Sequence, residues 1–196
     1  MEKEEDNKQF EAEKSKIIDL LKKHNIDISS WGSGEAKTIN DLVSEIISGE
    51  SQLTENENGE IIRFLRAVAA IITFTDSKGK KYQLVEDRQE FVDGRIRKRE
   101  RYLITSISEK MMPDEEPKMT LVRGIKEELG ISVGLNINDE PVAEEKEYVS
   151  YNFPGFKSKS KVYTFNVSLD AISYNPDGYI ERQPDKTTFF VWEKIR

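Results

Sequence analysis

RGIKEELGI, residues 123–131, is the stretch that decides the fold. Its apolar residues follow helical spacing, which predicts the second half of an amphipathic helix. Pro117 suits the first helical position because its backbone angle is fixed there, and Gly130 is a natural end. Gly124 is unexpected in the interior, because only proline disfavours a helix more strongly than glycine.

The two sides of this helix are predicted to differ in character. Positions 124, 127 and 128 share one face, since residues three and four apart are neighbours on a helix. Glu127 and Glu128 are therefore expected to point toward a common volume. The predicted buried stripe consists of Leu121, Val122, Ile125 and Leu129.

The segment around this helix resembles the box of the Nudix hydrolase family. That pattern is Gly, five residues, Glu, seven residues, Arg-Glu, an apolar residue, any residue, Glu-Glu, any residue, Gly and an apolar residue. Two positions depart from it: Glu109 stands for the leading glycine, and Gly124 for the glutamate of the Arg-Glu pair. The matching residues are Glu115, Arg123, Ile125, Glu127, Glu128, Gly130 and Ile131.

The resemblance implies a fold, a cofactor and site residues. The fold would be α/β (α+β), a Nudix-like α/β/α sandwich with a mixed sheet over residues 61–196. The cofactor would be Mg²⁺ or Mn²⁺. Glu127 and Glu128 would be metal ligands in the catalytic centre. Glu115 would be a supporting carboxylate there, Arg123 its structural partner, and the glycine at 130 structural.

Gly124 cannot take the role of the glutamate that it replaces. Mg²⁺ is commonly held by one or two protein carboxylates together with phosphates and waters, so two glutamates can still bind one ion. The glycine then records either loss of catalysis or a relocated ligand. Candidates for a relocated ligand are Glu109, Asp114 and Glu116.

Another carboxylate is expected from the loop DAISYNPDGYIERQPDK, residues 170–186. In the family such a loop, before the last strand, often contributes one to the catalytic centre. Glu181 is the first choice here and Asp185 the second. The alternative is that both are ordinary solvated loop residues.

Basic residues supply candidate contacts for substrate phosphates. Arg95, Arg97, Arg99 and Arg101 alternate, so in a strand their guanidinium groups share one face. They either bind phosphate, with Arg97 and Arg99 central, or give an edge strand a charged face that opposes aggregation. Lys110 precedes the box helix where the family often has a basic residue.

The aromatic residues are expected to be structural, and the single histidine is expected to be exposed to solvent. Tyr148, Tyr151, Phe153 and Phe156 could stack a base, but aromatic residues on strands usually belong to the core. His24 ends a predicted helix among lysines and is expected to be solvated.

The rest of the chain divides near residue 60, which predicts a helical N-terminal extension (residues 1–60) before a Nudix-like domain (61–196). Helices are predicted over residues 9–24 and 38–50, followed by a polar connector. Strands are predicted from residue 61, around a turn at 76–79, and over 94–107, 147–153, 160–169 and 187–195. An acidic loop is expected before residue 147.

Composition limits the classes of function. The chain has 196 residues, 34% charged residues and a net charge of -7, which argues against general binding to nucleic acid or anionic membranes. The absence of cysteine excludes thiolate zinc sites and cysteine nucleophiles. No apolar run is long enough to span a bilayer, and the acidic N-terminus is unlike a secretory signal, so a cytoplasmic protein is expected.

The predicted function is metal-dependent hydrolysis of a diphosphate linkage in a nucleoside-diphosphate-type compound. Dense phosphate charge needs a divalent ion to neutralise it and to acidify the attacking water. The partner would be a nucleotide-type small molecule, and the oligomeric state is left open. The alternatives are a catalytically impaired module that binds a nucleotide as a sensor or regulator, and a protein-interaction scaffold.

Overall fold

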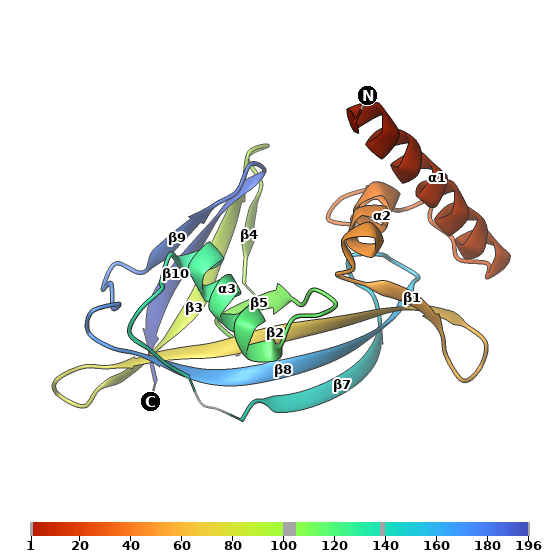
Figure 1. Cartoon of the computed structure of the whole chain (residues 1–196). Helices are drawn as coiled ribbons and strands as arrows, with labels where there is room; N and C mark the ends of the chain where they lie inside the picture. Colours follow the sequence, from red (N-terminus) through yellow and green to blue (C-terminus); the bar gives the residue numbers. More distant parts are fainter. Residues whose placement is uncertain (1, 100–104, 138–139, 196) are drawn as a thin grey trace. The chain divides into compact units, whose positions relative to one another are not determined.

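The computed structural model describes residues 2–99, 105–137 and 140–195. Three helices and one sheet form a mixed α/β fold in this part of the chain (Figure 1), which confirms the predicted fold class. The helices are α1 (Glu2–Lys23), α2 (Ile39–Ser48) and α3 (Pro117–Leu129). The strands are β1 (Gln52–Glu55), β2 (Ile61–Thr75), β3 (Lys81–Phe91), β4 (Ile96–Lys98), β5 (Ile107–Lys110), β6 (Leu135–Ile137), β7 (Val142–Val149), β8 (Lys157–Leu169), β9 (Tyr179–Arg182) and β10 (Lys186–Lys194).

The sheet has the strand order β6-β8-β2-β3-β10-β9. The short strands β1 and β5 pair with β2, β4 pairs with β3, and β7 pairs with β8. Strand β10 lies antiparallel to both β3 and β9. Strand β5 is antiparallel to β2, with Glu109 opposite Val68. These pairings place β5, β9 and β3 where their side chains can approach α3.

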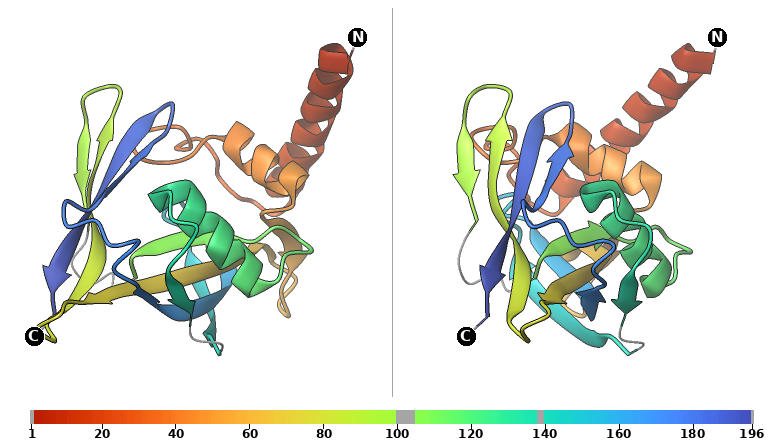
Figure 2. Two further views of the ribbon diagram at one scale, coloured as in Figure 1. Left: turned by 60° about the vertical axis from the view of Figure 1, so that its left-hand side comes forward. Right: turned by 90° about the vertical axis from the view of Figure 1, so that its left-hand side faces the viewer.

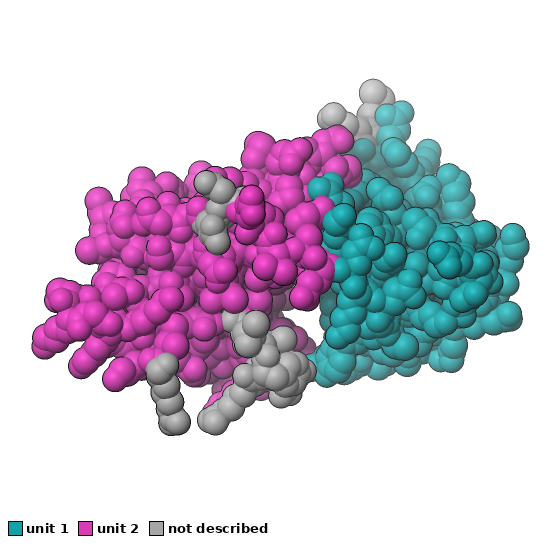
Figure 3. All heavy atoms as spheres, turned by 90° about the horizontal axis from the view of Figure 1, so that it is seen from below, with its two compact units in different colours: residues 1–66, 145–161 teal, residues 67–144, 162–196 magenta. Residues whose placement is uncertain are grey.

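The chain forms two compact units, coloured separately in Figure 3. Unit 1 comprises Met1–Arg66 and Glu145–Lys161, and unit 2 comprises Ala67–Glu144 and Val162–Arg196. Strands β2, β7 and β8 contribute residues to both. The box helix and its candidate partners all belong to unit 2. A division into folding domains near residue 60 stays a prediction.

Unit 1 is built around the two N-terminal helices. Thr38 and Asp41 form a capping box that starts α2, and Gly49 ends it in the left-handed conformation. None of the described helices is both long and apolar enough to cross a bilayer. The core of unit 1 contains Ile17, Leu21, Leu42, Val43, Ile61, Phe153 and Phe156.

Unit 2 has its own core, on which α3 packs (Figure 2). Leu121 and Ile125 are fully buried and Leu129 is nearly so, because spacing by four residues places all three on one side of the helix. Val122 is 39% exposed, so its predicted burial is wrong. Strands contribute Val68, Ala70, Ile72, Leu84, Ile107, Phe165, Val167 and Phe190.

Several predicted strand boundaries are wrong. The polar connector contains β1, and the expected acidic loop contains β6 and β7. The stretch predicted as a strand over residues 147–153 leaves the sheet after Val149, because Phe153 and Phe156 turn into the core of unit 1. The predicted strand over residues 94–107 yields only β4 and the beginning of β5 among the described residues.

The structural roles of the aromatic residues are also settled in part. Phe153 and Phe156 are fully buried and pack with Trp31, which confirms the core alternative for these two. Tyr151 is 75% exposed, and its hydroxyl group donates a hydrogen bond to Glu35. His24 is half-buried, with a buried Nε2 that has no hydrogen-bond partner among the described residues, so the prediction of a solvated histidine is wrong.

Candidate functional site

Helix α3 has ends that its own sequence determines. Pro117 lies in its first turn after the N-cap residue Glu116. Gly130 adopts φ 70° and donates its backbone N–H to the carbonyl of Lys126 at 3.0 Å. A glycine takes this left-handed conformation without steric cost, so the helix ends where the sequence predicts. Between these ends the helix lies near β5 and β9.

The interior glycine has a steric explanation. A Cβ atom built on Gly124 would lie 3.0 Å from Cβ and 3.3 Å from Cγ of Glu109. Gly124 is buried, and Glu109 projects toward it from β5. The glycine thus gives the Glu109 side chain room to pack against the helix backbone. This packing offsets the low helix propensity of glycine.

Arg123 and Glu115 form a pair with two hydrogen bonds. The Nε of Arg123 donates to Oε1 of Glu115 at 2.8 Å, and Nη2 donates to Oε2 at 2.9 Å. Such paired contacts are stronger and more directional than single ones. The arginine holds the pKa of Glu115 down to about 2. The resemblance assigns these two residues as structural partners.

Glu115 also ties the loop before α3 to the helix itself. Its Oε2 accepts the backbone N–H of Met112 at 3.0 Å and the hydroxyl of Thr120 at 2.9 Å. Arg123 completes the link by donating Nη2 to the carbonyl of Lys110 at 3.0 Å. The carboxylate of Glu115 is therefore engaged in shaping the loop that connects β5 to α3.

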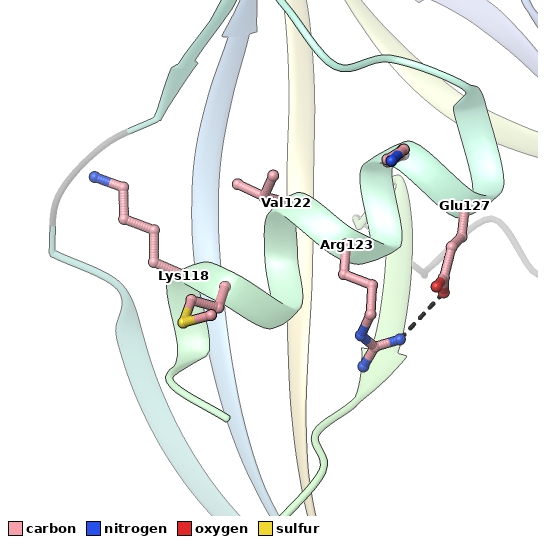
Figure 4. A pocket seen from close by; sticks show the side chains of 6 residues that line it. Lys118, Val122, Arg123 and Glu127 are labelled. Carbon is pink, nitrogen blue, oxygen red and sulfur yellow. Dashed lines mark hydrogen bonds and ion pairs between the residues drawn. The ribbon is translucent and has the colours of Figure 1, made fainter. Parts of the chain in front are cut away.

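Arg123 reaches two further carboxylates. Its Nη1 lies 3.3 Å from Oε1 of Glu109 and 3.1 Å from Oε2 of Glu127. Glu127 is exposed and lines an open surface pocket of about 670 Å³, in which its carboxylate points toward Arg123 (Figure 4). The other lining residues are Lys118, Met119, Val122 and Lys126.

Glu128 lies in a different environment from Glu127. It is half-buried, and its pKa is raised to about 8, first because of burial and then because of the charges of Glu181, Glu109 and Glu86. Lys186 opposes this rise. We call Glu86, Glu109, Glu128 and Glu181 the acidic cluster; they come from β3, β5, α3 and β9. Gathering like charges in a partly buried place is costly without a cation.

Glu181 lies on strand β9, and the prediction that it lies in a loop is wrong. It is opposite Thr188 of β10, and its Oε1 accepts a hydrogen bond from Gln183 at 2.6 Å. Strand β9 packs near α3, which explains why the charge of Glu181 acts on Glu128. Asp185, in the turn between β9 and β10, is exposed.

The basic candidates have local partners. Lys110 is half-buried on β5. Arg97, on β4, donates to Oε1 of Gln89 at 2.8 Å, and Arg99 donates to the carbonyl of Thr105. Burial lowers the pKa of Arg99, while Glu86 and Glu193 raise it. Arg95 pairs with Asp93 in the preceding turn.

A continuous row of four arginines on one strand is not present among the described residues. Strand β4 ends at Lys98, so Arg99 lies just beyond it, and the predicted Arg101 lies outside the described residues. Whether Arg97 and Arg99 contact phosphate stays a prediction.

Glu86 is the member of the acidic cluster that the sequence reasoning missed. It lies on β3 beside a register shift, where Phe189 of β10 pairs with Arg88 and Phe190 pairs with Glu86. The sequence signal is the run EDR inside an otherwise regular strand, residues 86–88. Consecutive charges in a strand that lies between two others are unusual, because one of them must face the covered side.

The acidic cluster is not a finished metal centre. Among residues 2–99, 105–137 and 140–195, no group of three or more Asp, Glu or His side chains is arranged closely enough to hold an ion. The donors are nevertheless all carboxylate oxygens, the kind that Mg²⁺ and Mn²⁺ prefer. The chemical type of these donors fits such an ion.

Comparison with known proteins gives neighbours in structure only. No family model and no curated protein matches the chain. An Ap4A hydrolase of C. elegans has 17% identity, covering 67% of this chain and 80% of its own, with a TM-score of 0.39. An E. coli dihydroneopterin triphosphate pyrophosphohydrolase has 16% identity, coverages of 66% and 79%, and a TM-score of 0.39. A Nudix hydrolase from M. smegmatis has 13% identity, coverages of 73% and 79%, and a TM-score of 0.36. At these identities a function has to be argued from the residues of this chain.

Proposed function

We propose that the chain is a Nudix-type hydrolase that cleaves a diphosphate linkage in a nucleoside-diphosphate-type compound with Mg²⁺ or Mn²⁺. The observation that supports this most is the arrangement around α3. The Glu115–Arg123 pair shapes the loop before the helix, and the charges of Glu181 and Glu109 act on Glu128 of the helix. The matched box positions thus coincide with a gathering of carboxylates.

The fit to a divalent ion rests on charge and donor type. Burial raises the pKa of Glu128 first, and the charges of its acidic neighbours raise it further, so a cation placed among them would relieve their repulsion. Glu127 and Glu128 would hold the ion, with Glu115 supporting them through Arg123. When bound, the ion neutralises phosphate charge and lowers the pKa of the attacking water.

The remaining side chains have roles that follow from their chemistry. Glu181, whose charge acts on Glu128 from strand β9, is the candidate to accept the proton of the attacking water. Lys110, Arg97 and Arg99 are the candidates to bind phosphate oxygens, for which arginine offers two parallel N–H donors. We expect the protein to act in the cytoplasm on a small nucleotide.

A second candidate function is favoured by a specific observation. Gly124 brings no carboxylate, and the described residues hold no closely arranged group of three metal-ligand side chains. A nucleotide-binding module that senses its ligand without hydrolysing it would tolerate both features. A scaffold that only binds proteins would tolerate them as well, without any ligand.

The test uses four proteins and a panel of nucleotide sugars, dinucleotides, ADP-ribose and nucleoside triphosphates with Mg²⁺ or Mn²⁺. The variants are Glu128→Gln, Glu127→Gln and the control Glu144→Gln, which changes an exposed glutamate of β7. Turnover that Glu128→Gln loses and Glu144→Gln keeps supports the hydrolase. A ligand that raises the melting temperature without turnover supports the sensor, and no response to any compound supports the scaffold.

A further inference from the structure

We propose that Glu109 supplies, from strand β5, the carboxylate that helix α3 lacks at position 124. The ligand position has moved from the helix to the strand that packs against it. This inference rests on the proposed function, because it assigns Glu109 to the same metal site. It differs from that function in naming a residue at a place where the family pattern has glycine.

Glu109 and a side chain at position 124 would meet in the same space. Strand pairing with β2 fixes the backbone of Glu109 opposite Val68, so its Cβ cannot easily retreat. A Cβ on Gly124 would approach that atom to 3.0 Å, which is tighter than nine in ten real Cβ contacts, so Glu109 would have to shift by a few tenths of an ångström. A glutamate at 109 and a side chain at 124 therefore compete for the same space. The two departures from the family pattern are coupled through this contact.

The Glu109 carboxylate lies beside the guanidinium group of Arg123. Its Oε1 lies 3.3 Å from Nη1 of Arg123, the same nitrogen that contacts Oε2 of Glu127 at 3.1 Å. Its negative charge also acts on Glu128. Glu109 thus shares an Arg123 nitrogen with Glu127 and acts on Glu128 through its charge, which places it near both box glutamates.

The other relocated-ligand candidates do not occupy this place. Asp114 and Glu116 are exposed. The ion pairs of Arg123 involve Glu109, Glu115 and Glu127, and neither exposed residue takes part in them. Their charges are also not among those that act on Glu128. The structure therefore favours Glu109 over both.

The experiment measures Mn²⁺ binding to the full chain from the loss of the free-ion signal in electron paramagnetic resonance. The variants are Glu109→Gln, Gly124→Glu, Glu109→Gly, and the exchange Glu109→Gly/Gly124→Glu, with Glu128→Gln and Glu144→Gln as references. Melting temperatures without metal accompany each measurement. Glu109→Gln keeps the shape of the side chain, so its result does not depend on whether the bulkier variants fold.

We expect Glu109→Gln to weaken Mn²⁺ binding by at least about tenfold, the scale on which ligand and supporting groups act at metal sites. Gly124→Glu should lower the melting temperature, because both side chains then claim one volume. The exchange should melt above Gly124→Glu and bind Mn²⁺ more tightly than Glu109→Gly. Glu144→Gln should match the unaltered protein.

Two results would overturn the inference in different ways. If Glu109→Gln binds Mn²⁺ as the unaltered protein does while Glu128→Gln does not, Glu109 is no ligand and the proposed metal site survives. If Glu128→Gln also binds normally, or the unaltered protein binds no Mn²⁺, the proposed function itself fails and the role of Glu109 fails with it.

Discussion

Arg123 and Glu115, eight positions apart, face each other with two hydrogen bonds of 2.8 and 2.9 Å. The pair joins the first half of the box to its helix. It is only partly exposed, with relative side-chain exposures of 30% and 21%. An ion pair with this geometry contributes more to stability than an ordinary surface pair.

We predict that Glu115→Gln destabilises the protein at neutral pH and not in acid. The folded-state pKa of Glu115 is lowered to about 2 from an ordinary 4.5, so its contribution is present above pH 4.5 and lost as the pH falls toward 2. After allowance for partial exposure we expect about 1–2 kcal/mol at pH 7. Urea unfolding of both proteins between pH 7 and pH 2.5 measures this difference.

The control for this prediction is Glu60→Gln. Glu60 also pairs with a cation, Lys157, at 2.6 Å, but both side chains are well exposed. Its effect should be smaller than that of Glu115→Gln at every pH. An equal effect of the two substitutions would show that the Glu115–Arg123 geometry adds nothing.

We predict opposite pH behaviour for Glu128. Its folded-state pKa is raised to about 8, so the folded protein binds a proton that the unfolded chain has released, and stability falls as the pH rises from about 4.5 to 8. Glu128→Gln removes this fall. Without metal, its stability relative to the unaltered protein should grow by about 2 kcal/mol between pH 5 and pH 8.

The neighbouring substitution Glu127→Gln provides the matched comparison. Glu127 is exposed and pairs with Arg123, so its removal should change stability by a similar small amount at both pH values. Added Mg²⁺ should reduce the pH dependence of the unaltered protein. A flat profile for the unaltered protein would contradict the assigned environment of Glu128.

We predict that Gly178→Ala is far more costly than Gly79→Ala. Both glycines have positive φ, 79° and 76°, but a Cβ on Gly178 would overlap the carbonyl oxygen of Phe190, whereas Gly79 faces open space. Gly79→Ala should cost about 1–2 kcal/mol from backbone strain alone. Gly178→Ala should cost about 1–3 kcal/mol more from overpacking. Because Gly178 precedes β9, the variant should also displace Glu181, which chemical shifts of that strand would report.

The sequence predicted elements whose signals are local. Pro117 and Gly130 mark the ends of α3, and the apolar run before Lys194 marks β10 within one residue. Strands β1, β7 and β9 were missed because they contain few apolar residues. Their conformation depends on pairing with β2, β8 and β10, which periodicity within one segment does not reveal.

In the candidate site, too, local relationships could be predicted from the sequence and contacts between distant segments could not. The spacing of Glu115, Arg123 and Glu128 could be read from the chain, because a helix and its preceding loop place them together. Glu109 could be named only as one of three candidates, and Glu86 not at all, since strands β5 and β3 bring them to α3. The role of Gly124 emerged only from the contact with Glu109 across two elements.

Our last prediction concerns unit 1. Arg63 of β2 and Glu45 of α2 are both buried, and Nε of Arg63 donates to Oε2 of Glu45 at 3.0 Å. Lys37 and Ser51 donate to the same carboxylate, at 2.8 and 3.3 Å. Glu45→Ala should therefore cost about 3–5 kcal/mol, because it leaves the Arg63 charge buried and unpaired.

The double variant Glu45→Leu/Arg63→Met separates the free-energy cost of an unpaired buried charge from the net contribution of the ion pair to stability. Apolar side chains of similar volume need no partner, so this variant should recover most of the stability that Glu45→Ala loses. Urea unfolding followed by far-ultraviolet circular dichroism measures all three proteins. If Glu45→Ala costs less than about 1 kcal/mol, the range of exposed pairs, then Arg63 must regain water when its partner is removed. The contact between α2 and β2 would in that case rest on the apolar core of unit 1 rather than on the buried charges.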